Sequence, residues 1–189
     1  MSNQSSNNKR IARNTLLLYF RMFITMAVGL FTSRVILDSL GVEDYGIYNL
    51  VGGFVTMFNI FRAGLISSTQ RFITFDLGKG DMNELRNTFS TSLIIFLFIS
   101  CVIVVIEEVI APWFIQNKLT IPECRMTAAM WVFQFSLITL ILNLISSPYN
   151  ALIIAHEKMG EFAYISIFEV VAKLVVAYAI YISPFDKLI

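Results

Sequence analysis

The stretch Phe162–Ile182, FAYISIFEVVAKLVVAYAIYI, decides the fold of this chain. It is apolar over most of its length and long enough to cross a bilayer as a helix, which takes about 20 residues. Glu169 and Lys173 lie near its middle, where a charged side chain costs about 3 kcal/mol on insertion scales. A chain keeps charges at this depth when they face a hydrated interior lined by protein. The stretch therefore predicts a membrane protein with a polar interior.

Glu169 precedes Lys173 by four residues, which places both on one face of a helix. The acid lies nearer the N-terminus, and this is the better order for an ion pair. Two roles are open for Glu169: it neutralises Lys173, or it relays protons.

The composition supports a membrane protein. Hydrophobic residues make up 57% of the 189 and charged residues 14%, whereas about 25% of the residues in a soluble domain are charged. The net charge is +1 and no basic face appears, so we expect no nucleic-acid partner. The two cysteines, Cys101 and Cys124, have no disulfide or zinc spacing, and we expect neither a metal nor a cofactor.

The hydropathy pattern predicts an all-α integral membrane protein with about five transmembrane helices. We expect residues 1–13 to form a mobile cytoplasmic tail and residues 14–189 to form the helical domain. The first span is no cleavable signal peptide, because it is too long, contains Arg21 and lacks a small-residue cleavage site. The expected spans are residues 15–37, 48–67, 90–110, 128–147 and 162–182.

The basic residues of the loops set the orientation. One side of the membrane would carry seven of them, namely Lys9, Arg10, Arg13, Arg71, Lys79, Arg86 and Lys158, and the other only Lys118, Arg125 and Lys187. The positive-inside rule then places the N-terminus in the cytoplasm. Trp113 and Trp131 both fall at the external interface in this orientation, as an aromatic belt requires.

At 100° per residue, four of the five spans carry a polar face. We expect Thr25, Asn59 and Asn143 on these faces to line one shared cavity. Packing between helices is the alternative, because small and weakly polar residues also gather at helix interfaces in membranes. The third span has almost no polar residue, so we expect Ile94, Phe98 and Val105 to face lipid.

Positive charge dominates the spans. They contain Arg21, Arg34, Arg62 and Lys173 against Glu169 and the adjacent pair Glu107 and Glu108, which lies toward the external rim. A hydrated cavity of this charge favours an anion, and guanidinium groups suit phosphate through forked hydrogen bonds. Arg21, Arg62 and Lys173 are the candidate anion ligands. Arg21 can instead snorkel to the headgroups, and Arg34 suits an anchor at the external end.

No catalytic constellation appears, and we expect no enzyme. His156 is the only histidine and lies in a short turn, Ala155–Lys158. The glycines at 52, 53, 78 and 80 are not followed by the Gly-Lys-Ser/Thr of a phosphate-binding loop, which argues against an ATPase.

Three stretches resemble polysaccharide flippases. They are Arg34–Leu50, RVILDSLGVEDYGIYNL; Ser68–Ile73, STQRFI, with Leu77–Asp81, LGKGD; and Pro148–Met159, PYNALIIAHEKM. The resemblance is to Wzx-like exporters of O-antigen or teichoic acid, within the multidrug/oligosaccharidyl-lipid/polysaccharide exporter superfamily. It covers nearly the whole chain from about Asn14.

The resemblance implies a transporter with two related helical lobes around a central cavity. Such a protein flips lipid-linked oligosaccharide or polysaccharide precursors across the bacterial cytoplasmic (inner) membrane by alternating access. Arg21 and Arg62 loosely match basic positions on the first two helices that are thought to engage the lipid diphosphate. The implied partners are the bilayer, the lipid-linked glycan and glycan polymerase machinery. Because the chain stops at Ile189 after five spans, we expect an N-terminal fragment.

Three other functions compete with this interpretation. A multidrug-and-toxin-extrusion type of cation-coupled drug exporter would need a central acid in the first span, where Arg21 stands. A membrane scaffold or assembly subunit would use the polar faces only for packing. A membrane-embedded glycosyltransferase would need acidic residues in an external loop. The expected external loop Gln116–Thr127 is short and contains one acidic residue, Glu123.

Overall fold

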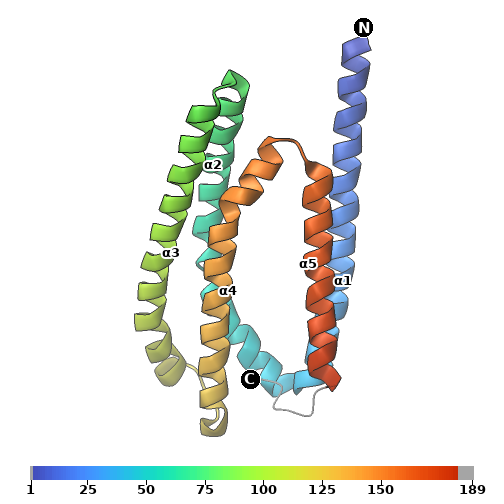
Figure 1. Ribbon diagram of the computed structural model, residues 1–189. Helices are drawn as coiled ribbons and strands as arrows, with labels where there is room; N and C mark the ends of the chain where they lie inside the picture. Colours follow the sequence, from blue (N-terminus) through green and yellow to red (C-terminus); the bar gives the residue numbers. More distant parts are fainter. Residues whose placement is uncertain (1, 183–189) are drawn as a thin grey trace. The chain divides into compact units, whose positions relative to one another are not determined.

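A computed structural model describes residues 2–182, apart from the side chains of residues 2–7, 9, 10 and 61. This part of the chain is helical and contains no strand: α1 spans Ser2–Thr56, α2 Asn59–Lys79, α3 Met82–Lys118, α4 Glu123–Ala155 and α5 Met159–Ile182 (Figure 1). Four stretches are long and apolar enough to cross a membrane, namely Ile11–Thr56 of α1 and the whole of α3, α4 and α5. The predicted all-α membrane fold is confirmed.

The chain divides into two compact units. Among the described residues, unit 1 contains α1 up to Ser39 together with α5, and unit 2 is Leu40–Ala155. The division within α1 falls beside Gly41, whose φ of 78° and ψ of 171° interrupt the helix. Residues with a side chain rarely adopt this conformation, so glycine permits the kink. A glycine just after the first expected span also predicts a left-handed cap at the end of that helix. The φ of Gly41 has the sign of such a cap, but its ψ is extended.

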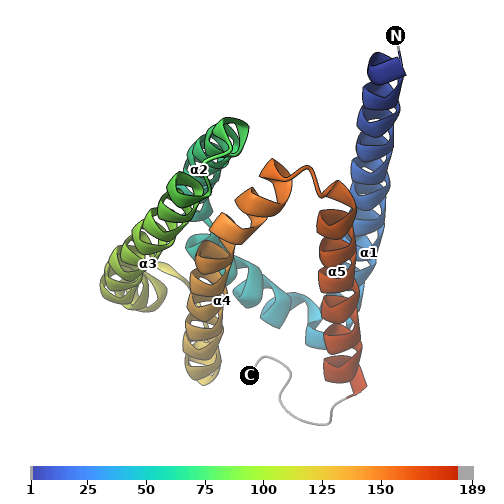
Figure 2. The ribbon, with the colours of Figure 1, turned by 45° about the horizontal axis from the view of Figure 1, so that its top comes forward.

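Unit 1 is a pair of helices that lie side by side in both views (Figures 1 and 2). The rings of Phe31 and Tyr178 are 6.4 Å apart, and the Arg21 guanidinium lies over the Phe162 ring. The contact made later in α1, by Phe31, is also the one made later in α5, by Tyr178. The two helices therefore run in the same direction.

Unit 2 holds the larger core, built by the end of α1 with α2, α3 and α4. Val51, Val55, Phe96 and Phe133 are fully buried in it. The α3 helix contributes one stripe at spacings of three and four residues: Ser92, Phe96, Ser100, Ile103, Glu107, Ala111 and Ile115. The other side of α3 exposes Ile94, Phe98 and Val105, and their exposure is confirmed.

The expected second span, residues 48–67, is not one helix. The helix α1 ends at Thr56, and α2 begins at Asn59. Between them the backbone is tightened: Phe58 N–H donates to the Val55 carbonyl, and Ile60 N–H to that of Met57. Hydrogen bonds between residues three positions apart are those of a 3₁₀ turn, which often marks a bend in a helix.

The turn between α2 and α3 follows its local sequence. Gly80 is left-handed (φ 75°, ψ 11°) and ends α2. The Asp81 side chain accepts hydrogen bonds from the backbone N–H groups of Asn83 and Glu84 and caps α3. Asp81 and Glu84 have the spacing of a capping box, but Glu84 instead accepts a hydrogen bond from Lys79 Nζ at 3.0 Å, and this bond raises the pKa of Lys79.

Two other expectations concern the ends of helices. The sequence predicts a helix end or a kink at Pro112 and at Pro148. Both prolines lie inside helices, α3 and α4, and α4 bends in its second half (Figure 1). The segment 1–13, expected as a mobile tail, is helical from Ser2 onward.

Candidate functional site

Arg21 lies on the face of α1 that meets α5. Its Nη1 donates to Ser166 Oγ at 3.2 Å, and its guanidinium carbon is 4.5 Å from the centre of the Phe162 ring. Its Nε is buried without a hydrogen-bond partner. The guanidinium is therefore held by a hydroxyl and an aromatic face, and neither contact neutralises its charge.

Glu169 and Lys173 form the ion pair that their spacing predicts. Lys173 Nζ lies 2.7 Å from Glu169 Oε1, and the two side chains are 65% and 58% exposed within this chain. Lys173 follows Ser166 by two helical turns on the same face of α5, about 10 Å along the axis. Lys173 thus shares a face with the Arg21 contact, but its own charge is balanced.

Arg62 is held within unit 2. Its Nε donates to Ser147 Oγ at 2.8 Å, and Ser147 in turn donates to the Asn143 carbonyl at 2.7 Å. Ser147 is fully buried and precedes Pro148 in α4. The contact therefore ties the beginning of α2, just after the break in the helix, to the bent part of α4.

The three uncharged candidates have different surroundings. Thr25 donates to the Met22 carbonyl, and the Asn143 amide to the Thr139 carbonyl. Both bonds are local to one helix and leave acceptors available. The Asn59 Oδ1 is buried without a partner at the first residue of α2. A buried amide oxygen left unpaired is costly, so Asn59 is the one of the three that calls for a donor.

The structure therefore places the candidate residues in two groups. Arg21, Thr25 and the Glu169–Lys173 pair belong to unit 1; Arg62, Asn59 and Asn143 belong to unit 2. Within the described residues neither Arg21 nor Arg62 has a carboxylate partner, whereas Lys173 has one. Among the candidate residues, each unit thus contributes a guanidinium without a carboxylate partner, a feature suited to binding an anion.

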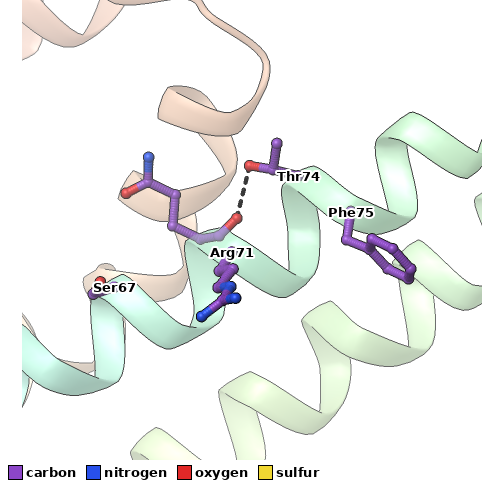
Figure 3. Close-up of a pocket in the computed structure, with 5 residues that line it drawn as sticks. Ser67, Arg71, Thr74 and Phe75 are labelled. Carbon is purple, nitrogen blue, oxygen red and sulfur yellow. Dashed lines mark hydrogen bonds between the residues drawn. The ribbon is translucent and has the colours of Figure 1, made fainter.

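Two further residues were missed as site candidates from the sequence. Arg71 lies with Ser67, Gln70, Thr74 and Phe75 around an open hollow of about 510 Å³ on α2. In Figure 3 its guanidinium contacts none of the other residues drawn; the dashed bond joins Thr74 to the Gln70 carbonyl. The helical spacing of Ser67, Arg71 and Thr74 is the signal that could have identified this face.

Glu107 is the second such residue. It is 0% exposed, and neither carboxyl oxygen has a hydrogen-bond partner. The sequence places it toward the external rim and gives no indication of its burial, because both faces of α3 are apolar around it.

The comparisons with known proteins identify a family. The family model described as MatE matches residues 13–179, which is most of the chain. No curated protein and no solved structure matches. Members of the matching family are transporters and not enzymes. The chain therefore belongs to the MatE family, and with it to the multidrug/oligosaccharidyl-lipid/polysaccharide exporter superfamily of membrane exporters.

Proposed function

We propose that this chain belongs to a flippase for lipid-linked oligosaccharide or polysaccharide precursors. It would lie in the bacterial cytoplasmic membrane with its N-terminus inside, beside the glycan polymerase machinery. The observation that carries the proposal is the pair of guanidiniums, Arg21 and Arg62, that have no carboxylate partner in their units. The diphosphate of a polyprenyl-linked sugar is the anion that suits them.

The remaining donors of the two arginines support this assignment. A guanidinium has five N–H donors in a planar fork. Arg21 uses one of them on Ser166, and Arg62 uses one on Ser147. Both keep donors for phosphate oxygens, and charge-assisted bonds of this kind contribute about 1.5–3 kcal/mol each.

Lys173 has a secondary role in this proposal. Glu169 already balances it, so Lys173 contributes to an anion site only when Glu169 turns away or is protonated. Thr25, Asn59 and Asn143 would supply uncharged donors and acceptors along the path of the sugar.

The charges of the candidate residues also argue against the alternative function, export of organic cations. An organic cation needs an unpaired acid in the cavity. Glu169 on α5 is bound to Lys173, and α1 presents Arg21 instead. The guanidinium without a carboxylate partner that each unit contributes, Arg21 or Arg62, therefore favours an anionic lipid.

Export of lipid-linked glycan, measured in cells that express the full-length protein at matched levels, tests the proposal. Arg21→Gln and Arg62→Gln should each reduce export by about tenfold or more, the equivalent of one charge-assisted bond. Arg→Lys at either position should retain part of it, because the charge remains and the fork is lost.

Arg34→Gln is the matched control, because Arg34 is exposed and lies 4.0 Å from Asp38, which balances it. Its export should stay near normal. Near-normal export by the Arg21→Gln/Arg62→Gln double variant would contradict the proposal. Resistance to organic cations that both single variants abolish would favour the drug exporter instead.

A further inference from the structure

The most unusual side chain of unit 2 is Glu107, which has no place in the proposed anion site. It is 0% exposed, and both carboxyl oxygens are buried without a hydrogen-bond partner. Buried polar groups almost always have such a partner, so an exception requires an explanation. No salt bridge of the described residues includes it.

The position of Glu107 in α3 explains its burial. It lies in the middle of the inward stripe, four residues after Ile103 and four before Ala111. Both belong to the core cluster of unit 2, which also contains Ala129 and Phe133 of α4. Ala111 and Ala129 are fully buried, and their small side chains allow the helices to approach closely.

The neighbouring polar groups do not form hydrogen bonds with Glu107. Gln134 of α4 donates its amide to Glu108 at 2.9 Å, and Glu108 is exposed. This bond also fixes how α4 lies against α3 at this level. Glu108 is the next residue of α3, and two ionised carboxylates so close together would repel each other.

The other charged residues of the packed elements lie elsewhere. Several have partners of their own: Arg125 of α4 pairs with Asp44 of α1, Arg62 with Ser147, and Asp76 accepts from Thr88. The remaining charged groups on these elements are Glu43 of α1, Arg71 and Lys79 of α2, and Glu123 of α4, and none of them forms a hydrogen bond with Glu107.

An ionised carboxylate in this place is strongly unfavourable, because no cation or hydrogen-bond donor compensates for its loss of water. A neutral carboxylic acid costs much less. We propose that Glu107 is a proton-binding site that controls the packing of α3 on α4. With its proton bound, the acid stays in the core. When the O–H bond breaks and the proton leaves to water, the charged carboxylate moves toward water and α3 separates from α4. The proposal does not depend on which substrate is exported.

Infrared spectroscopy of the full chain in lipid vesicles detects the proton directly. The carbonyl stretch of a protonated carboxyl group without a hydrogen bond should be present in the unmodified protein and disappear as the pH rises. It should be absent in Glu107→Gln, a neutral variant of the same shape, and retained in Glu108→Gln. A band unchanged by Glu107→Gln would overturn the proposal.

Thiol labelling tests the packing of α3 on α4. Ser100 lies on the same buried stripe, so Ser100→Cys, with Cys101→Ser and Cys124→Ser, becomes reactive only when α3 separates from α4. The rate at which a membrane-permeant thiol reagent labels this cysteine should rise by up to about tenfold for each unit by which the pH is raised. This is the largest rise that the release of one proton can produce. The labelling rate is compared with that of the same cysteine protein carrying Glu107→Gln. The comparison removes the rise that comes from ionisation of the thiol itself.

Adding Glu108→Gln should leave the pH dependence of labelling in place. Identical pH profiles with and without Glu107→Gln would overturn the proposal. So would labelling that responds to sodium concentration at fixed pH, because the ligand would then be a metal cation and not a proton.

Discussion

Replacing Gly41 by alanine should destabilise the protein through its backbone alone. The φ of 78° and ψ of 171° at Gly41 lie in a region that residues with a side chain occupy at a cost of about 1–3 kcal/mol. A Cβ built on Gly41 meets no atom within 4 Å, so no steric clash adds to this cost. The predicted loss in the free energy of unfolding is therefore about 1–3 kcal/mol.

Gly46 provides the matched control five residues further along α1. A Cβ there also meets nothing within 4 Å, but its φ is not positive, so Gly46→Ala should stabilise the helix by about 1 kcal/mol. The two variants should thus differ by about 2–4 kcal/mol. The assay is reversible unfolding of the full chain in mixed micelles, followed by far-UV circular dichroism. A Gly41→Ala protein that gains stability as Gly46→Ala does would refute the kink at Gly41.

Three further predictions use single sites. Asp81→Ala removes the side-chain acceptor for two backbone N–H groups at the start of α3 and should lower the free energy of unfolding by about 1 kcal/mol in the same assay; no change would contradict the cap. Thr88→Val leaves the buried Asp76 carboxylate without the donor that lies 2.6 Å from it and should cost about 1–3 kcal/mol; a neutral result would mean that the bond is absent. An impermeant thiol reagent applied outside cells should label the native Cys124 and not a cysteine at Lys79, and the reverse pattern would invert the proposed topology.

Four of the five expected spans, residues 15–37, 90–110, 128–147 and 162–182, lie within helices apolar enough to cross a membrane, because hydropathy is a local property. The stretch Phe162–Ile182 is helical throughout within α5, Met159–Ile182. The ion pair of Glu169 and Lys173 was equally predictable, since both partners lie on one helix at a fixed spacing.

The break between Thr56 and Asn59 was not predictable in the same way. No proline marks it, and Gly52, Gly53 and Thr56 are also typical of a helix-packing face. The burial of Glu107 had no local signal either. Because α3 is apolar all around, its hydrophobic period does not reveal which face turns inward. The packing of α2 and α4 against α3 selects that stripe.

The site residues show the same division between local and distant contacts. The sequence identified Arg21 and Arg62 as unusual cations but could not predict their partners. Ser166 and Ser147 lie 145 and 85 residues away along the chain and are brought near by packing. These contacts decide that the two guanidiniums are held by hydroxyls, while Lys173 is neutralised by an acid.

The central claim is that Arg21 and Arg62 bind the diphosphate of a lipid-linked glycan. The most direct measurement compares the affinity of the purified full-length protein for polyprenyl diphosphate, polyprenyl monophosphate and polyprenol. We predict that affinity falls in that order, by about tenfold or more between the diphosphate and the alcohol, and that Arg21→Gln with Arg62→Gln removes the difference. Equal affinity of the unmodified protein for all three lipids would contradict the claim.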